Sequence, residues 1–402
     1  MGESNNLIRV GFIIGNLSER WMGGLNYFKN LLYAISVLED RKIEPVIFLG
    51  KKTDKKIKTL FEQYAEVIEH TIFNRKSLQW FSWKITYKVL NSHFFLDRVL
   101  NKYNISILSH SGIMGLKSCK SINWIPDFQH LHLPHMFSKK EITRRNKYFM
   151  KFAKRSDVIV LSSNDALKDF INFAPDYVNK AKVLQFVSQP DEVYFKLTEK
   201  EELPFRAKYD LKGPFFYIPN QFWVHKNHIV AFKAIKVLKN RDIDLTLICT
   251  GHINDYHNKT YFKELKSFIK YNNLEKNIKL LGLVDYKEVF SFIKFSMAVI
   301  NPSLFEGWSS TVEECKSVSK TMILSDLSVH KEQYPGAIFF NRKSPEHLAD
   351  TMEKLIIGYD NKEEDNFSIE IIKNNLWLRT QSFGENYQKL ILTLKDKLFF
   401  GC

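Results

Sequence analysis

Short runs of β-branched and other apolar residues alternate with segments of helical length, and this alternation is the feature that most restricts the fold. Strands that alternate with helices are typical of a parallel sheet covered by helices, so each series of runs predicts a doubly wound α/β domain. The first series lies at 7–15, 44–50, 105–110, 121–127, 157–163 and 182–187. The second lies at 214–220, 244–251, 277–284, 296–303, 320–326 and 336–341.

The chain length also favours two domains, because 402 residues exceed the size at which one hydrophobic core keeps growing. Between the two series the sequence is polar, contains prolines and shows no sustained period, as expected of a linker. Two such domains should face each other across a cleft at the carboxyl ends of their strands, where a ligand would bind. We expect an N-terminal Rossmann-like domain at 1–190, a linker at 191–213, a C-terminal Rossmann-like domain at 214–375 and, at 376–402, a C-terminal helix that can pack back on the first domain.

The formal charge of +15 at pH 7 predicts an anionic partner: nucleic acid, a lipid surface or a phosphorylated small molecule. No window approaches the roughly 20 uninterrupted apolar residues that a membrane-spanning helix needs. No apolar, cleavable leader precedes the first strand-like run, and the cysteines show neither metal-ligand nor redox spacing, which predicts a cytoplasmic location. These cysteines are Cys119, Cys249, Cys315 and Cys402.

Two acids stand near the end of a predicted strand in a chain that is otherwise rich in positive charge. In the stretch NPSLFEGWSSTVEECKS, Glu306 and Glu314 flank seven residues rich in glycine and hydroxyl groups. Exposed amides at a helix N-terminus attract phosphate, carboxylates suit sugar and ribose hydroxyls, and Gly307 lets a ligand approach the backbone. The alternative is that the acids only cap the helix, because two pairs have capping-box spacing, Ser310 with Glu313 and Thr311 with Glu314.

The stretch SLFEGWSSTVEECKSVSKTMILSD resembles the glutamate, seven residues, glutamate signature of retaining GT-B glycosyltransferases of family 4, of the bacterial surface-polysaccharide type. The resemblance covers the C-terminal half and, through the two-domain architecture, nearly the whole chain. It implies transfer of a hexose-type sugar from a nucleotide-diphosphate donor, UDP- or GDP-linked, to a hydroxyl of a glycan or lipid-linked acceptor. It also implies retention of the anomeric configuration and no metal or other cofactor.

The same resemblance implies roles for individual residues. Glu306 would lie beside the donor sugar, Glu314 would bind the ribose, and Lys226 would hold the donor diphosphate. Gln221 stands where relatives carry a second cation, an arginine, which His225 or His228 could supplement. The full set implied to bind the donor is Gly23, Gly24, Gln221, Lys226, Leu283, Val284, Glu306, Gly307, Trp308, Ser309, Ser310, Thr311 and Glu314.

A second candidate group follows the predicted strand at 121–127, in the stretch NWIPDFQHLHLPHMFS. The sequence PDFQH is similar to a subset of the bacterial family 4 enzymes, and this similarity implies that Asp127 and His130 contact the donor sugar or the acceptor. His132 and His135 are expected to be packing or surface residues. A zinc site is disfavoured because no cysteine or acid lies at convincing ligand spacing. The predicted catalytic residues are therefore Glu306, Lys226, Asp127 and His130.

Two basic segments, 138–156 and 73–102, mix lysine and arginine with aromatic side chains. One interpretation is a solvated helix whose aromatic residues face the core. The other is docking on anionic lipid at the inner face of the cytoplasmic membrane.

Three alternatives to glycosyl transfer remain open. Another GT-B enzyme, such as a nucleotide-sugar epimerase or a phosphorylase, would share the fold. A non-catalytic glycosyltransferase-like subunit would explain the uncharged Gln221. Nucleic-acid binding is suggested only by charge, since no recognition motif supports it and the acids oppose a polyanion.

Overall fold

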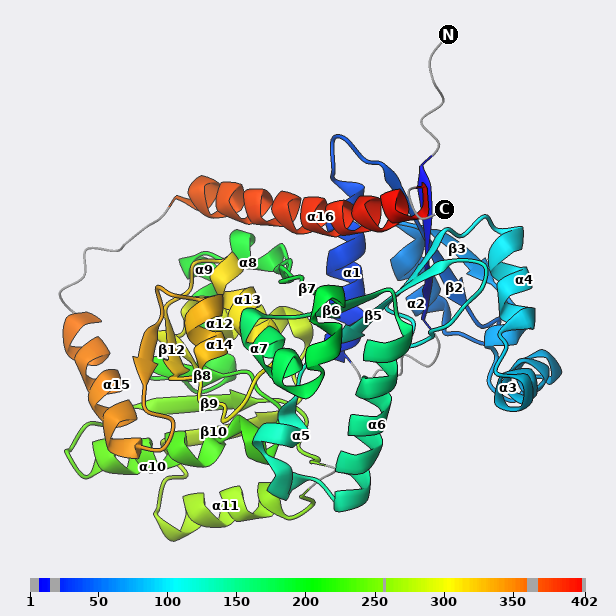
Figure 1. Ribbon diagram of the computed structural model, residues 1–402. Coiled ribbons are helices and arrows are strands. Elements are labelled where there is room, and N and C mark those ends of the chain that lie inside the picture. The colour runs from blue at the N-terminus through cyan, green and yellow to red at the C-terminus, as the bar shows by residue number, and fades with distance from the viewer. Residues whose placement is uncertain (1–6, 15–21, 256–257, 360–367, 400–402) are drawn as a thin grey trace. The chain divides into compact units, whose positions relative to one another are not determined.

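The protein consists of two compact α/β units, described here from a computed structural model (Figure 1). The structure describes residues 7–14, 22–255, 258–359 and 368–399. Within these ranges, every helix falls short of the length and apolarity that crossing a bilayer would require. Unit 1 comprises Met1–Phe128, Lys139–Val187 and Trp377–Cys402, and unit 2 comprises Gln129–Ser138 and Ser188–Leu376.

Unit 1 is built on a seven-stranded sheet in the order β3-β2-β1-β4-β5-β6-β7, with every pair parallel. Its strands are mostly buried on both faces, which explains why they read as nearly continuous apolar runs. The sequence analysis missed β3 because its residues, EVIE, are short and half acidic. The strands are β1 (Ile8–Ile13), β2 (Ile43–Leu49), β3 (Glu66–Glu69), β4 (Ile107–Ser109), β5 (Lys120–Ile125), β6 (Val158–Leu161) and β7 (Ala181–Val183).

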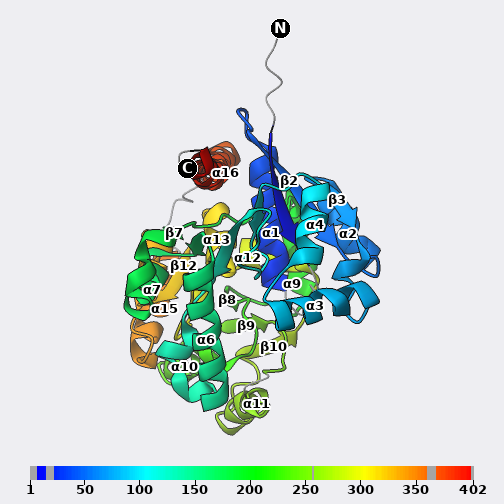
Figure 2. The same cartoon turned by 45° about the vertical axis from the view of Figure 1, so that its right-hand side comes forward.

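Helices of unit 1 connect these parallel strands. Helix α3 begins after Ser77, whose hydroxyl accepts from the Trp80 amide at 3.1 Å, and ends at Asn91 in the left-handed conformation. Figure 2 shows α3 and α4 as neighbours within this unit. The helices are α1 (Met22–Ser36), α2 (Lys55–Glu62), α3 (Leu78–Leu90), α4 (Phe94–Lys102), α6 (Lys139–Arg155) and α7 (Asn164–Phe173), with 3-10 turns at Thr71–Phe73 and Pro175–Lys180.

The long helix α16 (Ile369–Phe399) contributes its later turns to unit 1. The Gln381 side chain donates to the Val37 carbonyl at 2.8 Å, and the Gln388 side chain donates to the Asp40 carbonyl at 2.8 Å. A methyl group on Gly384 would lie 2.5 Å from the Ala34 carbonyl oxygen of α1. Glycine therefore allows the backbones of α16 and α1 to approach closely (Figure 1).

Unit 2 is built on a six-stranded parallel sheet in the order β10-β9-β8-β11-β12-β13. The strand order reverses between β8 and β11, so this pair forms the topological switch point of the unit. With two parallel-sheet units, the predicted α/β class is confirmed. The strands are β8 (Phe215–Ile218), β9 (Thr246–Thr250), β10 (Ile278–Gly282), β11 (Ala298–Asn301), β12 (Met322–Ser325) and β13 (Ile338–Phe340).

The segment that we expected to be a linker, 191–213, contains two short helices and packs into unit 2. Tyr194 and Leu211 are buried in the core between the sheet and α12 and α13. Thr198 and Glu201 form a capping box, a local signal that outweighs the polar composition of the segment. The helices of unit 2 are α5 (Gln129–His132), α8 (Val193–Lys196), α9 (Glu199–Lys208), α10 (His228–Lys239), α11 (Tyr261–Tyr271), α12 (Tyr286–Phe295), α13 (Ser310–Ser317), α14 (Ser328–Gln333) and α15 (Pro345–Tyr359), with 3-10 turns at Pro134–Met136 and Val224–Lys226.

Candidate active site

A buried polar network occupies the carboxyl ends of β8 and β11, at the switch point of unit 2. Asn220 follows β8, and Asn301 ends β11; the side-chain amide of Asn220 donates to Oδ1 of Asn301 at 3.2 Å. Thr311 of α13 donates to Asn220 at 3.2 Å, and Asn301 donates to the Ser309 hydroxyl at 3.0 Å. Because buried amides and hydroxyls are costly unless paired, this network fixes two loops and a helix N-terminus in one arrangement.

Glu306 joins this network and forms an ion pair with Lys226. Its Oε1 lies 2.7 Å from the Lys226 ammonium and 2.7 Å from the Ser303 hydroxyl. The same hydroxyl lies 2.7 Å from Oδ1 of Asn301, so its single proton is shared between two acceptors. The structure therefore brings together two residues that the sequence analysis placed in one site, although 80 positions separate them.

Electrostatics keep Glu306 ionised in this buried place. Burial by itself would raise the pKa of its carboxyl group. The charge of Lys226, with smaller effects of His330 and His225, outweighs burial and lowers the pKa of Glu306 to about 2. The side chain is consequently a permanent carboxylate near neutral pH.

Lys226 is held in place by the residue that follows it. Asn227 adopts the left-handed conformation, with φ of 55°, between the 3-10 turn Val224–Lys226 and α10. Its side-chain amide donates to the carbonyls of Pro302 and Arg342, each at 3.1 Å. Asn227 thus ties the loop that carries Lys226 to the loop that carries Glu306.

The N-terminus of α13 has a different cap from the one expected. Ser309 is the N-cap, and its hydroxyl accepts from the Val312 amide, so neither predicted capping box forms. Gln333 of α14 clamps the same residue: it accepts from the Ser309 amide at 3.0 Å and donates to the Ser309 carbonyl at 2.8 Å. Gln333 also donates to Glu313 at 3.2 Å, which shows that Glu313 serves the packing of α13 against α14.

Glu314 lies on α13 and has a very different environment from Glu306. Only 7% of the residue is exposed, and the Tyr286 hydroxyl donates to its Oε1 at 3.0 Å. Burial raises the pKa of Glu314 to about 7, even though the hydrogen bond from Tyr286 acts in the opposite direction. The two acids of the motif therefore differ in charge at neutral pH, since one is fully ionised and the other is partly protonated.

His330 of α14 acts electrostatically on Glu306, and the sequence analysis did not single it out. Its Nδ1 lies 3.0 Å from the carbonyl oxygen of Ser325, which can only accept, so Nδ1 carries the proton. Nε2 is then an acceptor, buried and without a hydrogen-bond partner in the part of the chain that the structure describes. Burial lowers the pKa of His330, whereas the Glu306 charge raises it. His330 thus adds an unused acceptor to the surroundings of Glu306.

The loop that carries Gln221 lies against the end of β9, and the two histidines that follow it in sequence, His225 and His228, differ in whether they can supply positive charge. A methyl group on Gly251 would lie 2.4 Å from the Asn220 carbonyl oxygen, so this glycine, with φ of 146°, lets β9 approach the Gln221 loop. His228 cannot supplement the missing cation, because it is fully buried against Phe222 and burial lowers its pKa to about 3. His225 does contribute positive charge near Glu306.

Comparisons with known proteins agree with this geometry. Residues 199–373 match the family model described as glycosyl transferases group 1. An uncharacterized glycosyltransferase of Methanocaldococcus jannaschii is 26% identical over 270 residues, which span 63% of this chain and 63% of the relative. A glycosyltransferase from Rickettsia africae has a TM-score of 0.64 at 15% identity and covers 98% of this chain and 99% of its own. Anabaena HepE, crystallised with UDP and glucose, has a TM-score of 0.66 at 15% identity, with 97% and 100% covered.

The chain has the GT-B fold, and its residues 199–373 match a glycosyltransferase family. The matched segment contains Lys226, Glu306 and Glu314, so the polar network lies inside the part of the chain that matches this family. Asn220, Asn301 and His330, which the sequence analysis missed, lie there too. Two of these residues could have been predicted from their positions: Asn220 and Asn301 are polar residues at the carboxyl ends of apolar strands, where ligands of α/β sheets bind.

The remaining predicted donor residues lie on both units. Leu283 is 72% exposed and, with Val284, follows β10 in unit 2. Gly23 and Gly24 belong to the first turn of α1 in unit 1, and residues 15–21 lie outside the described ranges. First-turn amides of a helix have no intrahelical acceptor, so helical glycines still present N–H groups.

The histidine-rich stretch after β5 divides between the units. Asp127 belongs to unit 1, whereas His130 is buried in α5 of unit 2. His132, expected to be a packing or surface residue, is exposed, and its ring lies 5.0 Å from that of Phe305, the neighbour of Glu306. Among the described residues, no group of three His, Cys, Asp or Glu side chains is arranged to hold a metal ion, and whether the enzyme uses one stays a prediction.

Proposed function

We propose that the protein is a glycosyltransferase that moves a hexose-type sugar from a nucleotide-diphosphate donor to a hydroxyl of a glycan or lipid-linked acceptor, with retention of configuration. One observation carries the proposal: a half-buried ammonium and a carboxylate meet at the switch point, joined to a helix N-terminus by a hydrogen-bonded network. A cation and backbone amides can bind the diphosphate of a sugar donor, and a carboxylate can bind the hydroxyl groups of the sugar. The seven-residue spacing of Glu306 and Glu314 supports assignment to the retaining family 4 enzymes.

Each part of the donor has a candidate partner in unit 2. Lys226 and the first amides of α13, at Ser310 and Thr311, would bind the diphosphate. Glu306 would accept from sugar hydroxyls, and Glu314 would bind the ribose. The UDP in the HepE crystal supports uridine as the first base to test.

The proposed chemistry needs no metal or other cofactor. Negative charge develops on the departing diphosphate as the sugar becomes oxocarbenium-like, and a preorganised cation and amides stabilise that charge. The acceptor hydroxyl would attack on the face from which the diphosphate departs, and a phosphate oxygen would take its proton. Glu306, ionised throughout, would stabilise the positive charge on the sugar.

We also propose that unit 1 contacts an anionic membrane surface, at the inner face of the cytoplasmic membrane. Segment 73–102 supports this better than segment 138–156, since Phe149 and Phe152 of α6 are buried in the core. Several apolar side chains of α3 and α4 are exposed, as are Lys84 and Lys88 of α3. The exposed apolar residues are Leu78, Phe81, Ile85, Val89, Leu90, Phe94 and Phe95.

A product analysis tests the transfer reaction. The purified enzyme is incubated with UDP-glucose, GDP-mannose and related donors, with and without an extract of lipid-linked glycans, and the anomeric configuration of the product is read by NMR. Product that forms only with acceptor supports transfer with retention; conversion of the donor alone indicates an epimerase. If Glu306→Gln left the amount of glycan product unchanged, the protein would instead be a non-catalytic glycosyltransferase-like subunit.

Membrane contact is tested separately by vesicle co-sedimentation. We expect binding to vesicles rich in phosphatidylglycerol, weak binding to neutral vesicles, and loss of binding in Phe81→Glu with Ile85→Glu. Both substitutions replace exposed side chains, so folding should be retained, which circular dichroism checks. Equal binding of the variant would contradict the proposed surface.

A further inference from the structure

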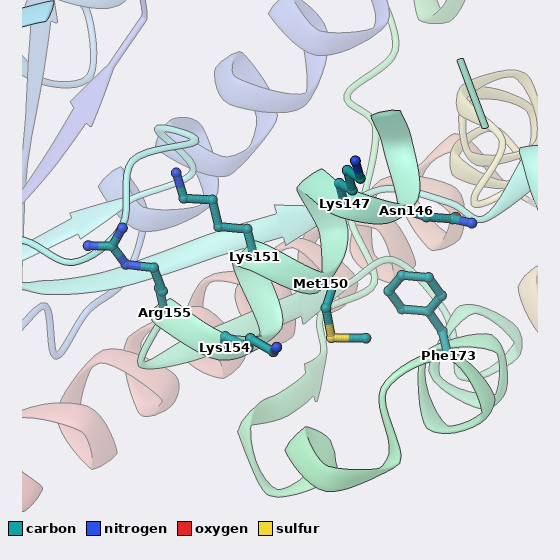
Figure 3. Close-up of a pocket in the computed structure, with 7 residues that line it drawn as sticks. All are labelled: Asn146, Lys147, Met150, Lys151, Lys154, Arg155 and Phe173. Atoms are coloured by element: carbon teal, nitrogen blue, oxygen red, sulfur yellow. The ribbon is translucent and has the colours of Figure 1, made fainter. Parts of the chain in front are cut away.

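Helix α6 and helix α7 of unit 1 border an open pocket of about 400 Å³ that the proposed donor site does not include (Figure 3). The pocket combines cations with apolar groups, and no acidic side chain lines it in the part of the chain that the structure describes. Its lining residues are Asn146, Lys147, Met150, Lys151, Lys154, Arg155 and Phe173.

Three lining residues share one face of α6, because Lys147, Met150 and Lys154 are spaced at i, i+3 and i+7. The ammonium groups of Lys147 and Lys154 make no ion pair or hydrogen bond among the described residues, and both residues are exposed. Figure 3 shows Met150 and Lys154 on the side of the helix that faces Phe173. This face of α6 thus presents two ammonium groups, of Lys147 and Lys154, next to the apolar side chains of Met150 and Phe173.

The other two cations of the pocket donate to neutral partners, which do not offset their charge. Lys151 donates to the Tyr87 hydroxyl, and Arg155 donates to Oδ1 of Asn91 at 2.9 Å; both partners belong to or follow α3. Lys147, Lys151 and Arg155 succeed one another at i, i+4 spacing, at which like charges repel. A bound anion would relieve this repulsion, which the fold itself leaves uncompensated.

The negative partial charge at the C-terminus of α6 is also offset by a nearby cation. Carbonyl groups at a helix C-terminus carry partial negative charge and would repel a phosphate. Here Lys180 donates to the carbonyls of Ala153 and Lys154, at 3.1 and 3.0 Å. The cation therefore neutralises the unfavourable end of the helix and adds positive charge beside the pocket.

We propose that this pocket binds the phosphate or diphosphate head of an amphiphile, with Lys147 and Lys154 contacting the phosphate oxygens and Met150 and Phe173 contacting the first part of the apolar chain. The mixture of groups favours an amphiphile over free phosphate, since cations alone would suit inorganic phosphate equally well. The pocket lies wholly in unit 1 and does not depend on the function proposed for unit 2.

Geranyl diphosphate and inorganic diphosphate are suitable soluble probes, and calorimetry on the full chain measures their affinities. We expect Lys147→Gln with Lys154→Gln to weaken geranyl diphosphate binding about tenfold or more. The matched control, Lys139→Gln with Lys140→Gln, removes the same charge from the same helix outside the pocket and should change the affinity less than about twofold. Inorganic diphosphate should bind about tenfold more weakly than geranyl diphosphate, because it lacks the apolar part.

A third variant separates this pocket from the proposed donor site. Lys226→Ala should leave the affinity for geranyl diphosphate unchanged, whereas loss of binding in this variant would place the probe in unit 2 and overturn the proposal. Equal losses in the pocket and control variants would also overturn it, since they would indicate only diffuse charge. Equal affinities for the two probes would reduce the pocket to a free-phosphate site.

Discussion

The ammonium of Lys226 lies 2.7 Å from Oε1 of Glu306, and only 16% and 9% of the two side chains are exposed. Burying two charges is costly, so such a pair persists only when each charge compensates the other and further hydrogen bonds complete it. Ser303 supplies one of those bonds. A donor diphosphate would compete with Glu306 for the same ammonium, so binding and pairing are coupled in this site.

Removing one member of the pair should therefore affect both stability and turnover. Glu306→Gln keeps the shape but leaves Lys226 as an uncompensated buried charge, which should lower the free energy of unfolding by about 3 kcal/mol. Transfer should fall about 100-fold or more, because the carboxylate no longer stabilises the sugar. Urea unfolding and an initial-rate assay measure the two effects.

The double variant distinguishes charge balance from a general packing defect. Adding Lys226→Met to Glu306→Gln removes both charges and should restore part of the lost stability, while turnover stays low. If the double variant were the less stable of the two, the pair would not be coupled as the geometry indicates.

Glu314 should make stability depend on pH. Its pKa is about 7 in the folded chain, above the ordinary value of 4.5 expected when unfolded, so the folded state binds more protons between these values. The free energy of unfolding should then fall as the pH rises from 4.5 to 7 and level off above it. Glu314→Gln should reduce the difference between pH 5 and pH 8 by about 2 kcal/mol in urea unfolding.

Glu306 and Tyr286 provide the internal checks on that pH dependence. Because the pKa of Glu306 is lowered to about 2, its contribution to stability is present above pH 4.5 and is lost as the pH falls toward 2. Tyr286→Phe removes a hydrogen bond that lowers the pKa of Glu314, so the decline should extend to higher pH. A profile that is the same in wild type and Glu314→Gln would contradict the assignment.

Asn227 should be needed for both its side chain and its backbone. Asn227→Ala removes two hydrogen bonds and puts alanine in the left-handed region, so the free energy of unfolding should fall by about 3 kcal/mol. Asn227→Gly removes only the hydrogen bonds and should cost about 1–2 kcal/mol. Thermal and urea unfolding compare the two; equal losses would mean that the backbone conformation carries no strain.

Gly251 should not tolerate a side chain. Gly251→Ala would push the Asn220 carbonyl, 2.4 Å from the new methyl group, and adopt an unfavourable φ, which should lower the free energy of unfolding by about 2 kcal/mol or more. The control, Gly213→Ala, has open space around it and should be nearly neutral. Calorimetric unfolding measures both, and similar changes in the two variants would contradict the close approach of β9 to the Gln221 loop.

The fold was largely predictable because its evidence is local. Apolar runs separated by helical segments define both sheets, and only β3, with two acids among its four residues, lacks that signal. Segment 191–213 was expected to be a linker because its composition is polar. Its residues Tyr194 and Leu211 are nevertheless buried, through contacts with elements that are distant in the sequence. Composition reports the average environment of a segment and not the fate of a single side chain.

The sequence by itself determined the α/β architecture, because the order of strands and helices is encoded along the chain. Its motif spacing also singled out Glu306, Glu314 and Lys226 as candidate site residues. Only the tertiary structure decided their chemistry. Whether Glu306 is ionised, whether Glu314 holds a proton and whether His228 can carry charge depend on burial and on neighbours such as Lys226, Tyr286 and Phe222. Those neighbours come from other elements, and electrostatic energy depends on distance in space rather than along the chain.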